Sequence, residues 1–66
     1  MYPIKLEKDY KIDVIEQENG RFAVVLFSPS GEIVNRHWTG TIDEAEEDAK
    51  LLQNNARNII MSHEND

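Results

Sequence analysis

Residues 17–34 read QENGRFAVVLFSPSGEIV, and this stretch decides the fold. Its centre, residues 22–27, is an uninterrupted apolar and β-prone run, which is typical of a strand with neighbours on both sides. Two turn signals bound the run, Asn19-Gly20 before it and residues 28–31, Ser-Pro-Ser-Gly, after it. The sequence therefore predicts two consecutive β-hairpins that share a central apolar strand.

The segments on either side of this run alternate between apolar and polar residues. The alternation is clear over residues 10–14, and residues 33–38 lead from a second apolar pair to a tryptophan. A period of two is typical of strands. We therefore predict three antiparallel strands, near residues 10–17, 21–28 and 32–38. Residues 2–6 also alternate, and because Pro3 suits an edge position they are candidates for a short fourth strand.

Beyond Gly40 the spacing of apolar residues changes to three and four. One stripe of a helix is then formed by Ile42, Ala45, Ala49, Leu52, Ala56 and Ile59. Thr41 and Glu44 fit a capping box directly before it. We predict a helix near residues 42–61 and expect the polar residues 62–66 to fray. The expected fold is one α+β domain over residues 1–66, a βββα arrangement with the helix packed on one face of the sheet.

Composition limits the classes of function. The chain has 66 residues, a formal net charge of -6 and no cysteine. A core of this size is thin, and the lack of cysteine excludes disulfides and thiolate zinc sites as supports, which leaves oligomerisation or very regular local structure. The acidic balance argues against direct binding of nucleic acid or of anionic membranes. With no apolar run of about 20 residues and no signal peptide, we expect a soluble, cytoplasmic protein.

Turn chemistry predicts which residues share a face of the sheet. A three-residue loop at residues 18–20 places Gln17 opposite Arg21 and Val14 opposite Val24. The same kind of loop at residues 29–31 places Leu26 opposite Val34 and Phe22 opposite Trp38. One face, expected to take the helix, then holds Tyr10, Ile12, Val14, Phe22, Val24, Leu26, Val34 and Trp38. A two-residue Asn-Gly loop would instead shift the pairing by one residue and exchange the faces.

The second face is expected to be unusually apolar for a sheet surface in contact with water. It would carry Ile15, Ala23, Val25, Phe27 and Ile33, beside Asp13, Asn35 and His37. Leaving such a surface bare forgoes several kcal/mol in a domain of about 5–10 kcal/mol total stability. Either a second copy or another protein covers it, or the amino-terminal segment and long neighbouring side chains do. The first alternative makes Ile15, Val25, Phe27, Ile33 and His37 the predicted partner-binding residues.

No set of residues predicts catalysis, a metal or a cofactor. The two histidines, His37 and His63, lie far apart in the sequence, whereas a metal site needs three or four convergent ligands. Ser28 and Ser30 have local reasons to be in a turn, and no serine lies in a nucleophile elbow. The glycines fall in turns rather than in a phosphate-binding loop. We therefore predict a protein that is not an enzyme.

The start of the predicted helix is crowded with carboxylates: Asp43, Glu44, Glu46, Glu47 and Asp48. The simplest interpretation is a solvated helix start, stabilised by the helix dipole. The alternatives are a docking patch for a basic partner and mimicry of a nucleic acid. Trp38 likewise has two interpretations, as the central packing residue of a small core or as an anchor for a partner.

Two parts of the chain resemble known families. Residues 20–34 resemble the repeat unit of the YegP-like small proteins, G-x-F-x-x-x-L-x-x-x-x-G-E-x-I, with Val34 at the last position. That resemblance implies a ββα or βββα unit used in pairs, and it carries no functional residue. Residues 2–9 and 40–45 are similar to the first strand and the helix start of HicB-type antitoxins, without that family's Pro-Asp-Leu-Pro-Gly run. This second similarity implies binding of a small basic toxin.

Two functions are therefore expected, in order. The first is a small protein–protein interaction module, homodimeric through a sheet face or an edge strand. The second is an acidic inhibitor or antitoxin-like protein, of the kind found in phages and mobile elements, that neutralises a basic nucleic-acid-binding partner. An accessory subunit of an enzyme is a third alternative.

Overall fold

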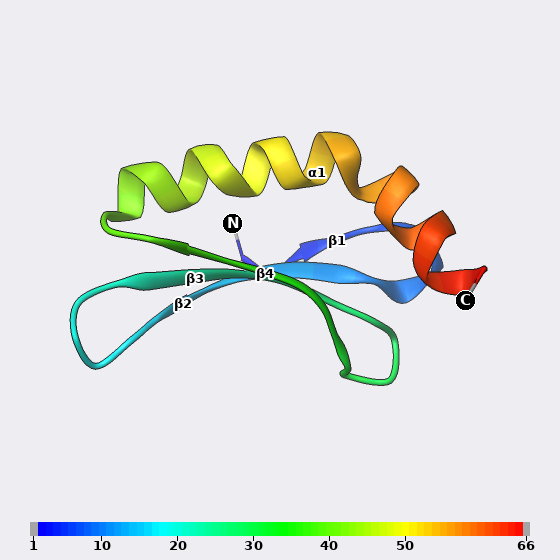
Figure 1. Ribbon diagram of the computed structural model, residues 1–66, viewed down its shortest axis with the longest axis horizontal. Helices are drawn as coiled ribbons and strands as arrows, with labels where there is room; N and C mark the ends of the chain where they lie inside the picture. Colours follow the sequence, from blue (N-terminus) through cyan, green and yellow to red (C-terminus); the bar gives the residue numbers. More distant parts are fainter. Residues whose placement is uncertain (1, 66) are drawn as a thin grey trace.

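The described part of the chain forms two layers, a four-stranded antiparallel sheet and one helix that lies across one of its faces (Figure 1). The computed structural model describes residues 2–65. The strands follow one another in the order β1-β2-β3-β4, so every connection joins neighbours. The elements are β1 (Ile4–Lys5), a 3-10 turn (Glu7–Asp9), β2 (Lys11–Glu16), β3 (Phe22–Phe27), β4 (Ile33–Thr39) and α1 (Ile42–Glu64). The predicted α+β class and the short fourth strand are confirmed.

The first hairpin forms as its turn residues predict. Gln17 donates its backbone N–H to the carbonyl of Arg21 (2.7 Å), and Gly20 donates to the carbonyl of Gln17 (3.1 Å). Gly20 has a φ of 81°, the left-handed conformation that closes a three-residue loop at low cost for glycine. The register that follows pairs Val14 with Val24, as expected.

The second hairpin has the expected three-residue loop but a different register beyond it. Ser28 donates its backbone N–H to Glu32 (2.8 Å). Phe27 then pairs with Ile33, but Leu26 pairs with Asn35, because the ladder shifts between Leu26 and Phe27. One additional residue of β4, Val34, is accommodated as a β-bulge. The predicted pairs Leu26–Val34 and Phe22–Trp38 are therefore wrong by one residue.

The bulge exchanges the faces on which the later residues of β4 lie. Trp38 pairs with Ala23 on the second face, not with Phe22 on the helix side. His37 pairs with Val24 on the helix side, where its Nδ1 contacts the Asp48 carboxylate of α1. Asn35 also moves to the helix side. The prediction that His37 and Asn35 belong to the second face is thus corrected, while Val34 still packs against the core as expected.

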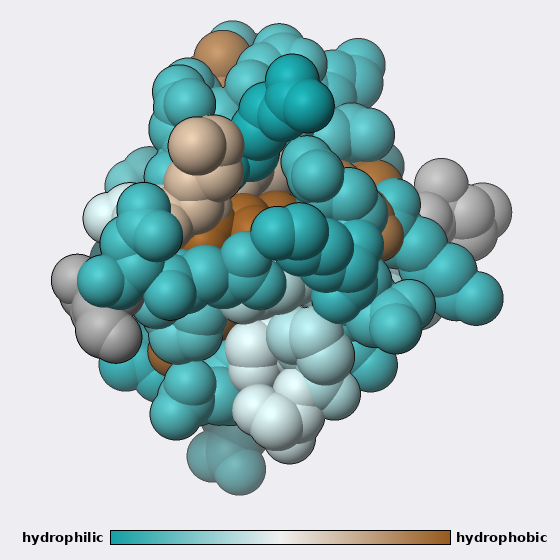
Figure 2. All heavy atoms as spheres, turned by 90° about the vertical axis from the view of Figure 1, so that its right-hand side faces the viewer, coloured by the Kyte–Doolittle hydropathy of each residue, from teal (hydrophilic) through white to brown (hydrophobic). Residues whose placement is uncertain are grey.

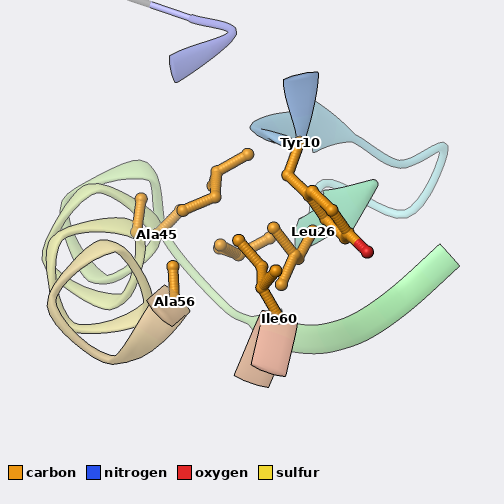
Figure 3. Packing of buried hydrophobic residues seen from close by; sticks show 8 residues of the cluster. Tyr10, Leu26, Ala45, Ala56 and Ile60 are labelled. Carbon is orange, nitrogen blue, oxygen red and sulfur yellow. The ribbon is translucent and has the colours of Figure 1, made fainter. Parts of the chain in front are cut away.

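The core lies between α1 and the inner face of the sheet. Figure 3 shows Tyr10 and Leu26 of the sheet layer meeting Ile60 of the helix, with Ala45 and Ala56 beside them. The small alanines let the helix axis lie close to the strands, and Ile12, Val24, Leu26 and Ile60 are fully buried between them. Residues Tyr2, Ile4 and Leu6 of the amino-terminal segment close one side of this core.

Helix α1 begins at its predicted cap and ends later than predicted. The Thr41 hydroxyl accepts a hydrogen bond from the Glu44 N–H (3.1 Å), which satisfies one free donor of the first turn. The helix continues to Glu64, so residues 62–64 of the expected tail are helical, and Asp66 lies outside the described residues. The His63 ring packs edge-on against Tyr10, with centroids 6.1 Å apart. Glu64 accepts hydrogen bonds from Lys8 Nζ (2.7 Å) and from the Tyr10 hydroxyl (3.4 Å).

The contact between Glu64 and Lys8 predicts a pH dependence of stability. The Lys8 hydrogen bond lowers the pKa of Glu64 from its ordinary value of 4.5. A carboxyl group whose pKa is lower in the folded than in the unfolded protein stabilises the native state at pH values above its unfolded-state pKa. This contribution is lost as the pH falls through its folded-state pKa. We expect Glu64→Gln to lower the free energy of unfolding at pH 7 and to differ less from the wild type below about pH 4.

Urea denaturation at a series of pH values between 3 and 7 measures this difference. Glu47→Gln is the matched control, because it removes the same charge from an exposed position of the same helix. A wild-type advantage over Glu64→Gln that stays constant across the whole pH range would contradict the proposed linkage.

Candidate functional site

The second face of the sheet is organised in rows of residues that lie side by side across the strands. The ladder pairing defines three rows: Lys11, Phe27 and Ile33; Asp13, Val25 and Arg36; and Ile15, Ala23 and Trp38. The middle residue of each row is apolar, and the third row is apolar throughout. Four of the five partner-binding residues predicted from the sequence, Ile15, Val25, Phe27 and Ile33, are therefore brought together on one face, and Trp38 takes the place expected for His37.

This face is only partly covered by its own side chains. Val25, in the central row between Asp13 and Arg36, is 2% exposed. Around it, large apolar side chains remain open to solvent: Ile15 is 38% exposed, Trp38 46% and Ile33 50%. The amino-terminal segment leaves the face open, because Ile4 pairs with Ile12 and points with it to the helix side. Neighbouring side chains thus shield the centre, and an exposed apolar margin is left around it.

Trp38 is held in place on this surface by Arg36. The guanidinium carbon of Arg36 lies 5.3 Å from the centroid of the indole ring, within the range of a cation–π interaction. Trp38 also borders a shallow depression formed by Gln17, Glu18 and Asn19 of the first hairpin loop. A tryptophan that is ordered by its own chain and still half-exposed has the properties of an anchor residue at a protein interface.

Charge on the second face differs from that of the molecule as a whole. Lys5 pairs with Lys11 at one end of the face, and Arg36 occupies the central row. The ladder places one carboxylate among them, Asp13. The central row therefore carries a cation on one side of buried Val25 and an anion on the other, which is a self-complementary arrangement.

The acidic residues at the start of α1 do not form one patch. Glu44 takes part in the helix cap, and its carboxylate accepts a hydrogen bond from the Thr41 hydroxyl (3.2 Å). Asp48 contacts His37 on β4. Glu46 lies on the opposite flank. The pKa of Tyr2 is raised, first by burial of its own hydroxyl and second by the negative charge of Glu46. The remaining two residues, Asp43 and Glu47, are exposed. Of the five, Glu44, Glu47 and Asp48 border a common cleft beside β4.

Ser28 and His63, whose side chains are of types that can serve in catalysis, have structural partners. The Ser28 hydroxyl, which is buried, accepts a hydrogen bond from the Glu32 N–H (3.1 Å). His63 lies 3.6 Å from a Glu32 carboxylate oxygen and packs on Tyr10. Within residues 2–65, no three His, Asp or Glu side chains gather in a way that could hold a metal ion. Nor does this part of the chain contain a helix with the length and apolar character needed to cross a membrane.

Comparison of the chain with protein-family models, with curated proteins and with solved structures finds no match. The candidate site therefore rests on the geometry of the chain itself.

Proposed function

We propose that this protein is a non-enzymatic protein–protein interaction module that forms a homodimer through the second face of its sheet. The observation that carries the proposal is the exposed margin of Ile15, Ile33 and Trp38 around the covered centre at Val25. Burial of apolar surface stabilises by about 25 cal/mol per Å², and a 66-residue domain has little core of its own to supply that energy. A second copy of the chain is always present at the same concentration as the first, so it is the partner most readily available.

The central row supports a twofold arrangement of two sheets packed face to face. Sheets packed in this way keep their strands within about 30° of each other. A twofold axis parallel to β3 and passing over Val25 would set Asp13 of one subunit against Arg36 of the partner subunit, and the reverse. The same axis would bring Ile15 near Trp38 of the partner subunit. Each subunit thus offers the partner an opposite charge on either side of an apolar centre.

Removal of one exposed apolar residue tests the dimer. We expect Ile33→Asp to convert a dimer into a monomer, because it places a charge in a surface that would be desolvated. Sedimentation velocity at micromolar concentrations measures the mass, and circular dichroism checks that the helix signal is retained. Met61→Asp on the outer surface of α1 is the matched control, since Met61 is 54% exposed against 50% for Ile33. A wild-type protein that is monomeric at all accessible concentrations would rule the dimer out.

A charge exchange tests the orientation of the two subunits. We expect Asp13→Arg and Arg36→Asp each to weaken the dimer by about tenfold or more, because each single change sets like charges against each other across the interface. The double variant restores opposite charges, and we expect it to recover most of the affinity. Dissociation constants from dilution-series sedimentation give the comparison. Additive losses in the double variant would contradict this orientation.

A second candidate function is supported by the cleft that Glu44, Glu47 and Asp48 border. Through this cleft the protein would act as an acidic inhibitor of a basic nucleic-acid-binding protein. Binding of that kind weakens with salt because it depends on exposed charges. We expect the triple change of Glu44, Glu46 and Glu47 to Gln to abolish salt-sensitive binding to a basic protein such as a histone without unfolding the protein. Unchanged affinity would remove this candidate.

A further inference from the structure

Strand β4 is the long open edge of the sheet. The strand order leaves two edges, of which β1 has 2 residues and β4 has 7. Within residues 2–65, β4 pairs with β3 and with no other strand. An edge strand presents a row of N–H and C=O groups that are free to pair with another extended segment. At about 3.3 Å per residue, β4 offers an edge of roughly 20 Å.

A groove runs beside this edge, between β4 and the flank of α1. Three adjoining depressions form it and share their boundary residues: the first and second share His37, Asp48 and Leu51, and the second and third share Ile59. The groove extends from Thr39 and Glu44 at the start of α1 to Val34 and His63 near its end. Figure 2, an end-on view from the carboxyl-terminal side, shows apolar surface at the bottom of the furrow between the helix layer and the sheet layer.

The groove has an apolar middle and an acidic end. Leu51 is 54% exposed and borders both the first and the second depression, beside half-buried Leu52 and Ile59. Glu44, Glu47 and Asp48 border the end near the start of α1. None of the residues that line the three depressions is a lysine or an arginine. The one imidazole at the acidic end, His37, is already in contact with Asp48.

We propose that the β4 edge and this groove bind an extended segment of a partner protein that carries apolar and basic residues at every second position, on the side that would face the groove. The segment would add a fifth strand to the sheet by main-chain hydrogen bonds to β4. Alternate side chains of such a strand point to the same face, so those on the helix side enter the groove. An apolar side chain would pack on Leu51, and a lysine or arginine would reach the carboxylates of Glu44 and Glu47. The lack of cations along the groove selects a basic segment over an acidic one or a nucleic acid.

This surface differs from the one proposed for the dimer and meets it at Trp38, which borders the first depression. The dimer would use the face that carries Ile33 and Trp38, whereas the groove opens on the helix side and at the sheet edge. A face-to-face dimer would leave both β4 edges accessible. Binding in the groove can therefore be measured on the Ile33→Asp variant as well as on the wild type, and its result does not depend on whether the dimer exists.

The probe is a synthetic eight-residue peptide, Val-Thr-Val-Thr-Lys-Thr-Lys-Thr, capped at both ends, which presents valine and lysine on one face of a strand and threonine on the other. We expect it to shift the backbone amide signals of β4 and of the Asp48–Ile59 part of α1 in nitrogen-15 NMR spectra, and to slow hydrogen exchange of β4 amides. A second peptide carries the same side chains with alternate backbone nitrogens methylated, which blocks strand pairing and keeps every charge. We expect the methylated peptide to bind about tenfold more weakly or worse.

Two variants with equal changes of charge complete the test. Leu51→Lys places a cation in the middle of the groove, and we expect it to weaken peptide binding by about tenfold. Met61→Lys is its matched control, because Met61 is also 54% exposed on α1 but lines none of the three depressions. We expect the control to bind as the wild type does.

Each of the other outcomes would overturn the proposal. Equal binding of the methylated peptide would show a purely electrostatic contact without strand addition. No binding at millimolar peptide, or shifts confined to the second face, would exclude the groove as the site. Protected β4 amides in the free protein, together with a dimer that Leu51→Lys disrupts and Ile33→Asp does not, would show that a second copy occupies the edge.

Discussion

The pairing between β3 and β4 includes one additional residue at Val34, and the composition of both sheet faces depends on it. In a strand every side chain alternates between faces, so one extra residue exchanges the positions of all residues that follow. Here the exchange brings His37 to the helix, where it contacts Asp48, and sends Trp38 to the opposite face beside Arg36. Without the bulge, the indole would be on the helix side and the imidazole on the open face. Both candidate interaction surfaces therefore depend on the same irregularity.

The two candidate interaction surfaces also depend on how closely the helix packs on the sheet. Ala45, Ala49 and Ala56 face the strands and are buried, so the helix lies near them without large side chains in between. The larger residues of α1 are then displaced to its flanks, and Leu51 on the β4 side remains half exposed. At the far end of the helix, Glu64 and His63 contact Lys8 and Tyr10, which closes the layer on the amino-terminal segment. The thin core is thus completed by polar contacts at its end.

Local signals in the sequence were sufficient to predict the strands, the helix and the first hairpin. Asn19-Gly20 predicted the loop that pairs Val14 with Val24, and Thr41 with Glu44 predicted the start of α1. The second register could not be predicted, because a regular and a bulged ladder have the same turn residues and nearly the same strand lengths. The end of the helix was missed for a different reason: the partners of Glu64 lie 54 and 56 residues away in the sequence, and its polar neighbours gave no local sign of them. Four of the five predicted partner-binding residues were placed on the second face in advance, whereas Trp38 was placed on the other face.

The uneven placement of carboxylates makes one end of the molecule more negative than the other. The molecule is elongated, 35 × 20 × 19 Å, and the start of α1 lies at the same end as the loop between β2 and β3 (Figure 1). That end carries Glu16 and Glu18 as well as the five acidic residues of residues 43–48, with Arg21 as the nearby cation. A charged partner approaching from solution would rotate the protein into alignment before the two surfaces meet. Added salt would then slow the rate of encounter far more than it would shorten the lifetime of the complex.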